Sequence, residues 1–253
     1  MKYLAFLDIL GFKDIVNKNT HDELYNIYMT LFGSTVLGLS QNATINEHSE
    51  TKIDTRKMQV YSRIISDSII LWTNDIEISS FVEIVKTTNL LLRNSIVGGL
   101  PLRGAICMGN LTRLQSKIDS PKFNCDALFG DALVKAYTKE GSQEWSGCVV
   151  ENDCLQRHMD MLVEIENTHP VMKKPFIDIL VEQGLLIKYN VPYKNDVIKE
   201  DYVINWVAKQ ESTFTEKYIR TSFSKYNKSI DVSDVEKKIK NTLDFVTFVS
   251  RPK

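Results

Sequence analysis

Hydrophobic residues in the first part of the chain follow two spacings, one typical of strands and one typical of helices. Residues 3–9 are apolar on both faces, as expected of a short strand that is buried on two sides. Residues 21–39 carry apolar side chains at helical spacing, which predicts an amphipathic helix. Two β-branched and aromatic runs, 58–65 and 68–73, are separated by two residues, the length of a tight hairpin loop. The pattern therefore predicts a strand, a helix and a β-hairpin in that order.

A second helix and another strand complete this unit. Residues 78–97 read as a helix that ends at a Gly-Gly pair, and residues 102–108 read as the following strand. The order is that of the ferredoxin-like βαββαβ arrangement, an α+β fold whose antiparallel sheet carries helices on one face. Its first strand lies beside the central hairpin. We therefore expect Asp8, near the end of that strand, to lie next to Asp67 at the hairpin tip.

The remaining segments carry weaker patterns. Residues 40–57 are rich in Asn, Ser, Thr and charge, and are expected to form a polar connection. Further elements are expected at residues 131–140 (helix), 147–150 and 202–207 (strands) and 232–245 (amphipathic helix). The sheet should thus be extended by a C-terminal strand and helices.

Charge and hydropathy limit the partners that the chain is expected to have. Thirty-one basic and 32 acidic residues give a net charge of -1, so no overall positive charge favours nucleic acid or an anionic membrane. No apolar run approaches the roughly 20 residues of a membrane-spanning helix, and the N-terminus lacks the pattern of a signal peptide. We expect a cytoplasmic protein that binds neither nucleic acid nor membrane.

Asp8 and Asp67 are the candidate chemical groups. A carboxylate at the end of an apolar strand is costly to bury unless a cation or hydrogen-bond donors compensate its charge. A second carboxylate beside it would repel it, unless metal ions bridge the two, as in two-metal phosphoryl-transfer sites. The alternative is that Asp8 caps the following segment and Asp67 only forms a turn.

Four short segments carry a resemblance to a known family. They are FLDILGF at 6–12, ISDS at 65–68, LRGAICMG at 102–109 and FGDAL at 129–133. Their order and approximate spacing resemble those of class III nucleotidyl cyclase catalytic domains, and most resemble the bacterial anti-phage pyrimidine cyclases of Pycsar systems. The resemblance implies a cyclase-like catalytic core at residues 1–150, with 151–253 as a C-terminal elaboration of the same domain.

The family's activity implies roles for individual residues. The enzyme would convert UTP, or else CTP, to the 3′,5′-cyclic monophosphate and pyrophosphate. Asp8 and Asp67 match the two aspartates that bind two Mn²⁺ or Mg²⁺ ions, and Ile9 matches the residue whose carbonyl also contacts metal. The backbone of Ile9, Leu10, Gly11 and Phe12 matches the triphosphate cradle.

Several positions depart from the family pattern. The Asn and Arg that purine cyclases use for the ribose and the transition state are replaced by Val134 and Thr138. Arg103 or Lys139 could supply the positive charge as a catalytic residue, and Lys135 could bind the substrate. Ordinary surface lysines are the alternative for the last two.

The base-reading positions also differ from those of purine cyclases. They hold Arg63 and Ala127, and Arg63 can only donate, which suits a carbonyl of uracil or cytosine better than an adenine amino group. The resemblance further implies a homodimer with active sites at its interface, and a separate effector protein that reads the cyclic nucleotide. Two other hypotheses remain open: an adenylate cyclase with a divergent base pocket, and an inactive cyclase-like binding module.

Overall fold

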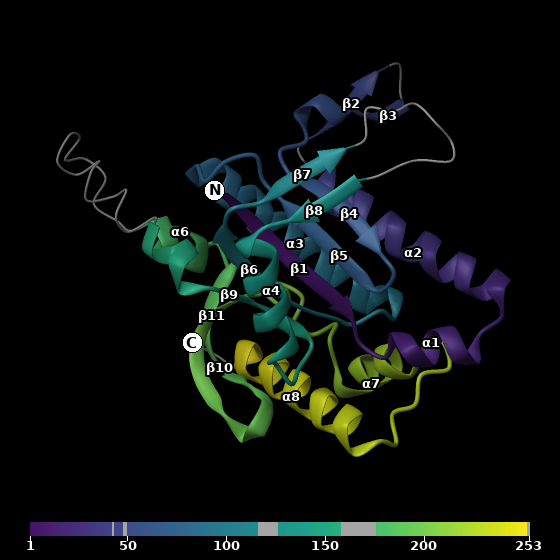
Figure 1. The fold of residues 1–253 in the computed structure, drawn as a ribbon. Helices are drawn as coiled ribbons and strands as arrows, with labels where there is room; N and C mark the ends of the chain where they lie inside the picture. Colours follow the sequence, from purple (N-terminus) through teal and green to yellow (C-terminus); the bar gives the residue numbers. More distant parts are fainter. Residues whose placement is uncertain (42, 48–49, 116–125, 158–175, 252–253) are drawn as a thin grey trace.

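The fold is built on one seven-stranded sheet, seen in a computed structural model (Figure 1) that describes residues 1–41, 43–47, 50–115, 126–157 and 176–251. The strand order is β10-β11-β9-β6-β1-β5-β4. The N-terminal elements are β1 (Lys2–Ile9), α1 (Phe12–Lys18), α2 (His21–Leu39), β4 (Tyr61–Ile65), β5 (Ser68–Trp72), α3 (Ile78–Gly98) and β6 (Leu102–Gly109). Within them β6, β1, β5 and β4 are neighbours and antiparallel. This confirms the expected α+β fold and its ferredoxin-like strand order.

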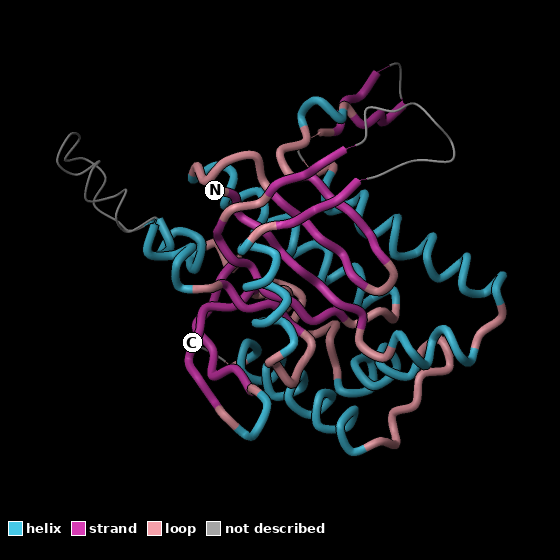
Figure 2. The backbone as a smooth tube through the Cα atoms, in the orientation of Figure 1, coloured by secondary structure: helices cyan, strands magenta, loops and turns pink. Residues whose placement is uncertain are grey.

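The C-terminal region continues the same sheet. After α4 (Asp131–Gly141), β9 (Gly147–Val150) pairs in parallel with β6, and β11 (Ile198–Ile204) pairs with β9 and β10 (Leu186–Pro192). Helices α6 (Phe176–Glu182), α7 (Glu216–Ser224) and α8 (Ser233–Ser250) are the helices of this region (Figure 2). No described helix is both long and apolar enough to cross a membrane.

Helices cover both faces of the sheet. On one face, Tyr3, Ala5 and Leu7 of β1 belong to the main apolar core, to which α2 and α3 contribute. On the other face, Leu4 and Phe6 belong to a smaller cluster that includes residues of α4. The ferredoxin-like pattern predicted helices on one face, but β1 is apolar on both faces, so its second face is also covered.

Several elements lie where the sequence predicted none. The polar connection at 40–57 contains β2 (Thr44–Glu47), β3 (Glu50–Ile53) and the short 3-10 helix Thr55–Lys57, and β7 (Thr112–Gln115) and β8 (Asp126–Phe129) form a second hairpin. Both hairpins lie outside the main sheet and lack an apolar alternation that would reveal them. The strand expected at 202–207 is β11, which begins earlier, at Ile198, and ends at Ile204. Its first three residues are exposed, so no buried alternation marked its start. Helices α1, α6 and α7, strand β10 and the 3-10 helix Lys194–Asp196 were not predicted.

Close contact between β1 and β6 depends on Gly104. A Cβ atom at this position would lie 2.5 Å from the Leu7 side chain and 2.6 Å from the Phe6 carbonyl oxygen. Glycine at the second position of the Arg-Gly pair therefore lets β6 approach the strand that carries Asp8.

Candidate active site

The sheet brings Asp8 and the hairpin tip together, as the topology predicted. In β1, Asp8 is paired with Ser68 of β5 on one side and with Arg103 of β6 on the other. The N–H of Ile9, the next residue, donates to the carbonyl oxygen of Asp67 at 3.1 Å. Because side chains alternate along a strand, Asp8 faces the same side as Phe6, which is the side covered by α4.

Asp8 lies in surroundings that disfavour its negative charge. Burial, followed by the nearby carboxylates of Glu140 and Asp67, raises the pKa of Asp8 to about 7, although Arg103 acts in the opposite direction. The Ser68 hydroxyl is its hydrogen-bond partner, at a long 3.5 Å. A cation placed between Asp8 and Asp67 would compensate both charges.

These carboxylates fit a metal ion whose coordination the substrate completes. Among the described residues no group of three or more His, Cys, Asp or Glu side chains could hold a metal by itself. Mg²⁺ in nucleotide-binding enzymes is commonly held by one or two carboxylates, with water and substrate phosphates as the other ligands. Asp8 and Asp67 would be the carboxylates of such a site, with the Ile9 carbonyl as a further oxygen ligand.

The hairpin tip is held in place by a tyrosine that the sequence analysis did not select. Ser66 adopts a left-handed conformation with φ 54°, and its carbonyl oxygen accepts a 2.9 Å hydrogen bond from the Tyr28 hydroxyl of α2. The Tyr28 ring also contacts Phe12 edge-on, with the ring centroids 6.1 Å apart. Tyr28 thus links the hairpin of Asp67 to the start of α1, which follows the strand of Asp8. The helical pattern showed only that Tyr28 lies on the inner face of α2.

Arg103 forms a buried ion pair beside Asp8. Its Nε lies 2.5 Å from the Glu140 carboxylate, and its Nη1 donates to the Gln143 carbonyl at 2.8 Å. The side chains of Arg103 and Glu140 are 12% and 4% exposed. Burial raises the pKa of Glu140, and Arg103 opposes that shift. Glu140 was missed in the sequence, where it reads as the last residue of an amphipathic helix.

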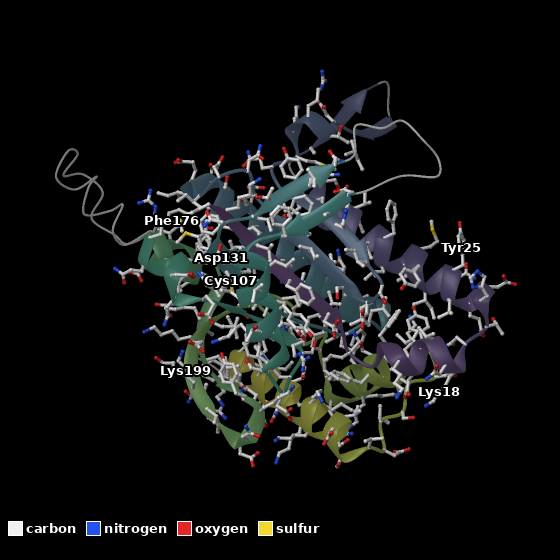
Figure 3. All side chains as sticks on the ribbon, in the orientation of Figure 1. Lys18, Tyr25, Cys107, Asp131, Phe176 and Lys199 are labelled. Carbon is white, nitrogen blue, oxygen red and sulfur yellow. The ribbon has the colours of Figure 1, made fainter. Side chains whose placement is uncertain are left out.

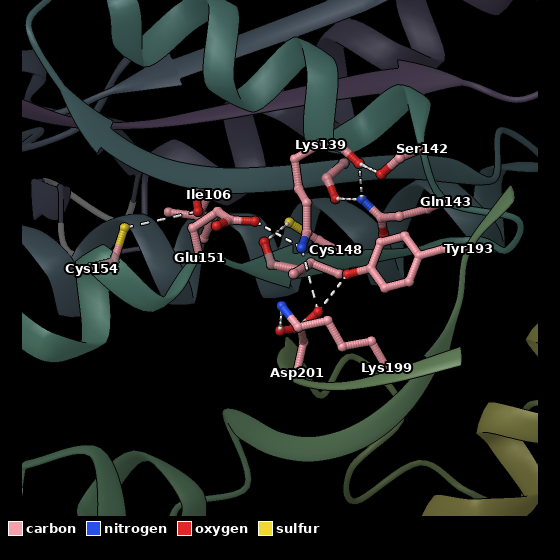
Figure 4. Close-up of polar contacts among 12 residues, drawn as sticks. Ile106, Lys139, Ser142, Gln143, Cys148, Glu151, Cys154, Tyr193, Lys199 and Asp201 are labelled. Atoms are coloured by element: carbon pink, nitrogen blue, oxygen red, sulfur yellow. Dashed lines mark hydrogen bonds and ion pairs between the residues drawn. The ribbon is translucent and has the colours of Figure 1, made fainter. Parts of the chain in front are cut away.

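The two α4 lysines bind carboxylates of their own chain. Lys139 Nζ lies 2.8 Å from Glu151 and 3.3 Å from Asp201, and 4.8 Å from the centroid of the Tyr193 ring (Figure 4). Asp201 also accepts a 2.6 Å hydrogen bond from the Tyr193 hydroxyl.

Lys135 lies one turn before Lys139 in α4, at 3.5 Å from both Asp131 and Asp153. Neither Lys135 nor Lys139 has a contact with Asp8 or Asp67 among the hydrogen bonds and ion pairs of the described residues. Their predicted roles at the substrate therefore stay predictions.

Arg63 and Ala127 lie close together, with Asp126 as the charged partner. Arg63 Nη1 donates to the Asp126 carbonyl at 2.6 Å, and its Nη2 pairs with the Asp126 carboxylate. The same carboxylate lies 2.7 Å from Arg113 Nη2. Asp126 immediately precedes Ala127 in β8, so a carboxylate paired with two arginines lies beside the two positions that the sequence analysis assigned to the base. The alignment of motifs selected the neighbouring alanine and so overlooked this acceptor.

The loop after Asp8 makes a sharp turn into α1. Leu10 N–H donates to the Pro101 carbonyl at 2.9 Å, and Gly11 has a left-handed φ of 81°. Such a φ is strained for residues with a Cβ atom, which explains the glycine. Leu10 and Gly11 also line a cavity of about 250 Å³.

Comparisons with known proteins give matches among solved structures. No family model matches the sequence, and no curated protein matches it either. A bacterial light-regulated adenylyl cyclase is 14% identical, with a TM-score of 0.47 over 87% of this chain and 97% of that one. The catalytic core of a rhodopsin-guanylyl cyclase with converted specificity, in complex with ATPαS, is 11% identical, with a TM-score of 0.47 over 81% and 94%.

A third match is the adenylyl cyclase CyaB from P. aeruginosa. It is 8% identical, with a TM-score of 0.43 over 80% of this chain and 92% of that one. At such identities the similarity concerns the fold alone, so an assignment of function has to rest on the site.

Proposed function

We propose that this protein is a nucleotidyl cyclase that converts a nucleoside triphosphate to its 3′,5′-cyclic monophosphate and pyrophosphate. The observation that supports this most is the junction of β1 with the β4–β5 hairpin. There the partly buried Asp8 lies beside Asp67 without an ion pair to a cation among the described residues. Such a pair of carboxylates is what a two-metal phosphoryl-transfer site requires.

The reaction assigns tasks to the residues at this junction. Asp8, Asp67 and the Ile9 carbonyl would hold two Mn²⁺ or Mg²⁺ ions, which would lower the pKa of the ribose 3′-hydroxyl and neutralise triphosphate charge. The loop from Ile9 to Phe12 would hold the triphosphate so that the 3′-oxygen and the leaving oxygen lie in line at the α-phosphorus. The new bond joins the 3′-oxygen to phosphorus, the bond to the β-phosphate oxygen breaks, and the hydroxyl proton passes to solvent.

Arg103 is the proposed source of charge for the transition state. It is paired with Asp8 across the strands, and its guanidinium binds Glu140 and the Gln143 carbonyl. A guanidinium held in this way is already oriented, so it would need no reorganisation when charge develops on the phosphate. Lys139 is the second candidate.

Arg63 and Asp126 would select the base. A guanidinium donates to a base carbonyl, and a carboxylate accepts from a ring N–H. Uracil presents both groups side by side, which favours UTP, whereas for CTP only the carbonyl contact applies. Guanine also presents a carbonyl beside an N–H, so GTP is the purine nucleotide to compare with UTP as a substrate.

A homodimer would complete the site. Six apolar side chains that are 41% to 65% exposed lie on the elements of the α4 side: Tyr61, Ile65, Leu114, Phe129, Val134 and Tyr137. Tyr61 stacks on Trp72 and Tyr137 contacts Phe6, which places both on this face. A second copy packed here would bury them and bring Arg63, Lys135 and Lys139 of one subunit towards Asp8 and Asp67 of the other.

A cyclic pyrimidine nucleotide would act as a second messenger in the cytoplasm. The resemblance to Pycsar cyclases suggests bacterial anti-phage defence, with a separate effector protein that binds the product. An adenylate cyclase with a divergent pocket and an inactive binding module are the competing proposals, and retention of both aspartates favours an enzyme over the latter.

Incubation of the purified protein with each of the four nucleoside triphosphates and Mn²⁺ tests the proposal. We expect cyclic UMP as the main product, identified by chromatography and mass spectrometry against 3′,5′-cyclic standards. Cyclic AMP as the sole product would favour the adenylate cyclase. Absence of any cyclic product, for a protein that still binds nucleotide, would favour the binding module.

A further inference from the structure

A positively charged cavity adjoins the loop that follows Asp8. It has a volume of about 250 Å³ and lies between Leu10 and Gly11 on one side and the start of α8 with its preceding segment on the other. Lys13, Lys228 and Lys238 all line it. Sites for whole small molecules usually measure roughly 300–1,000 Å³. This cavity therefore suits one part of a larger ligand.

Lys228 is a buried cation without a matching anion. It is 6% exposed, and its Nζ donates to the Gly99 carbonyl at 2.7 Å. No carboxylate of the described residues forms an ion pair with it, although buried lysines are almost always paired. Burial, with a contribution from Lys225, lowers the pKa of Lys228 to about 7. An anion bound in the cavity would supply the negative charge that is missing beside Lys228.

Lys238 on α8, which is only partly buried, also lacks a matching anion in the described part of the chain. Its Nζ donates to the Asp234 carbonyl at 3.2 Å, and the described residues contain no carboxylate in an ion pair with it. Burial lowers the pKa of Lys238, and Arg103 acts in the same direction. Glu144 acts in the opposite direction, but its carboxylate pairs with Lys237 at 3.5 Å.

The one carboxylate among the residues that line the cavity, Asp14, is already compensated. It lies 3.0 Å from Lys18 Nζ, which Figure 3 labels on α1, and it accepts a 2.7 Å hydrogen bond from the Ser229 N–H. The cavity thus keeps an excess of positive charge next to Gly11. Its other walls include apolar side chains of α7 and α8, which strengthen electrostatic attraction by excluding water.

We propose that Lys13, Lys228 and Lys238 bind the β- and γ-phosphates of the nucleotide, and then the pyrophosphate product. The inference rests on the proposed function, since Leu10 and Gly11 directly follow Asp8 and Ile9. An α-phosphate held at Asp8 would leave the terminal phosphates beside this cavity. Two of the three lysines come from the C-terminal region, which would therefore complete the substrate site within its own subunit.

Lys228 also has a purely structural explanation. It and Lys225 donate to the carbonyls of Gly99 and Gly98 at the end of α3, where cations stabilise a helix. If that were its whole role, substitution would lower thermal stability and leave anion binding unchanged. Lys238 has no such task at α3, so it provides the sharper test.

Calorimetric titration with inorganic pyrophosphate in metal-free buffer separates the two explanations. We expect Lys238→Met to weaken pyrophosphate binding about tenfold, as loss of one charge-assisted hydrogen bond would. Lys240→Met, which removes an exposed lysine of the same helix, should change the affinity for pyrophosphate less than about twofold. Lys13→Met and Lys228→Met should also weaken binding, the latter measured only if its thermal transition shows a folded protein.

Two results would overturn the inference: no pyrophosphate binding by the unaltered protein at millimolar concentration, or equal affinities of Lys238→Met and Lys240→Met. Asp8→Asn should keep pyrophosphate binding in this metal-free assay and lose cyclisation. A failure of the proposed function would appear as unchanged turnover in Asp8→Asn, whatever the lysine variants do.

Discussion

The two faces of the central sheet differ in how completely the chain covers them. On one face, alternate residues of β1 are buried in the large core with α2 and α3. On the other, Leu4 and Phe6 belong to a smaller cluster, Asp8 follows on the same side of β1, and nearby elements carry exposed apolar side chains such as Tyr61 and Tyr137. We call the face towards α2 and α3 the closed face and this second face the open face. Alternate residues of one strand thus serve two purposes. One set belongs to the main core, and the other buries Leu4 and Phe6 in the smaller cluster and ends at Asp8, in a site that a nucleotide and a second subunit would complete.

The largest expected effect concerns the two aspartates of the candidate active site. Asp8→Asn and Asp67→Asn should each reduce cyclic nucleotide formation at least about a hundredfold. Substitution of residues that merely hydrogen-bond to metal ligands already lowers metal affinity or activity by about 10- to 100-fold. Thermal unfolding should show that both variants stay folded. Asp22→Asn, on the exposed first turn of α2, is the matched control and should keep full activity. Near-normal rates in either site variant with Mn²⁺ would refute the two-metal assignment.

Mixing inactive variants tests whether the open face joins two subunits. Arg63→Ala and Asp67→Asn should each be inactive alone, and after subunit exchange should recover up to roughly a quarter of normal activity, since one site per mixed dimer is intact. A mixture of Asp8→Asn with Asp67→Asn should recover none, because both changes lie in the same half of the site. No recovery in the first mixture, despite proven exchange, would mean that each subunit carries a complete site.

The Arg103–Glu140 pair distinguishes a charge needed for stability from one needed for catalysis. Arg103→Met leaves Glu140 buried and unpaired, which should cost about 3–5 kcal/mol of unfolding free energy. The double variant Arg103→Met/Glu140→Met should recover most of that stability. Its kcat should stay low with a smaller change in KM, as expected for charge that acts in the transition state. Recovery of kcat together with stability would make the pair purely structural.

Substitutions on the two faces should affect different measurements. Leu7→Ala, on the closed face, should lower the free energy of unfolding by about 2–5 kcal/mol, because Leu7 is fully buried. Val134→Asp, on the open face, should change it by less than about 0.5 kcal/mol, because Val134 is 65% exposed. In sedimentation, Val134→Asp should shift the protein towards monomer. A large loss of stability in Val134→Asp would show that the open face belongs to the core of the single chain.

The sequence predicted those features that depend on local patterns. Apolar periodicity gave β1, α2, the Asp67 hairpin, α3 and β6, and the strand order followed from their succession. The adjacency of Asp8 and Asp67 followed from that order. The hairpins β2–β3 and β7–β8 were not predicted, because polar hairpins outside the main sheet need no apolar alternation.

Partners within the site depend on contacts between distant segments, which a pattern cannot show. Glu140 for Arg103, Asp126 for Arg63 and Tyr28 for the hairpin each come from another element. Lys228 illustrates the same limit, since its lack of a carboxylate partner emerges only once the α7–α8 segment packs on Gly11. Charged residues were visible in the sequence, but their pairing was not.

The central claim is that Asp8 and Asp67 hold two divalent ions together with a bound nucleotide. Titration with Mn²⁺ in the presence of 3′-deoxy-UTP, which cannot cyclise, measures this directly by the electron paramagnetic resonance signal of free Mn²⁺. The account predicts two bound ions per active site in the unaltered protein, and loss of tight Mn²⁺ binding in the double variant Asp8→Asn/Asp67→Asn. Equal Mn²⁺ binding by the two proteins would contradict it.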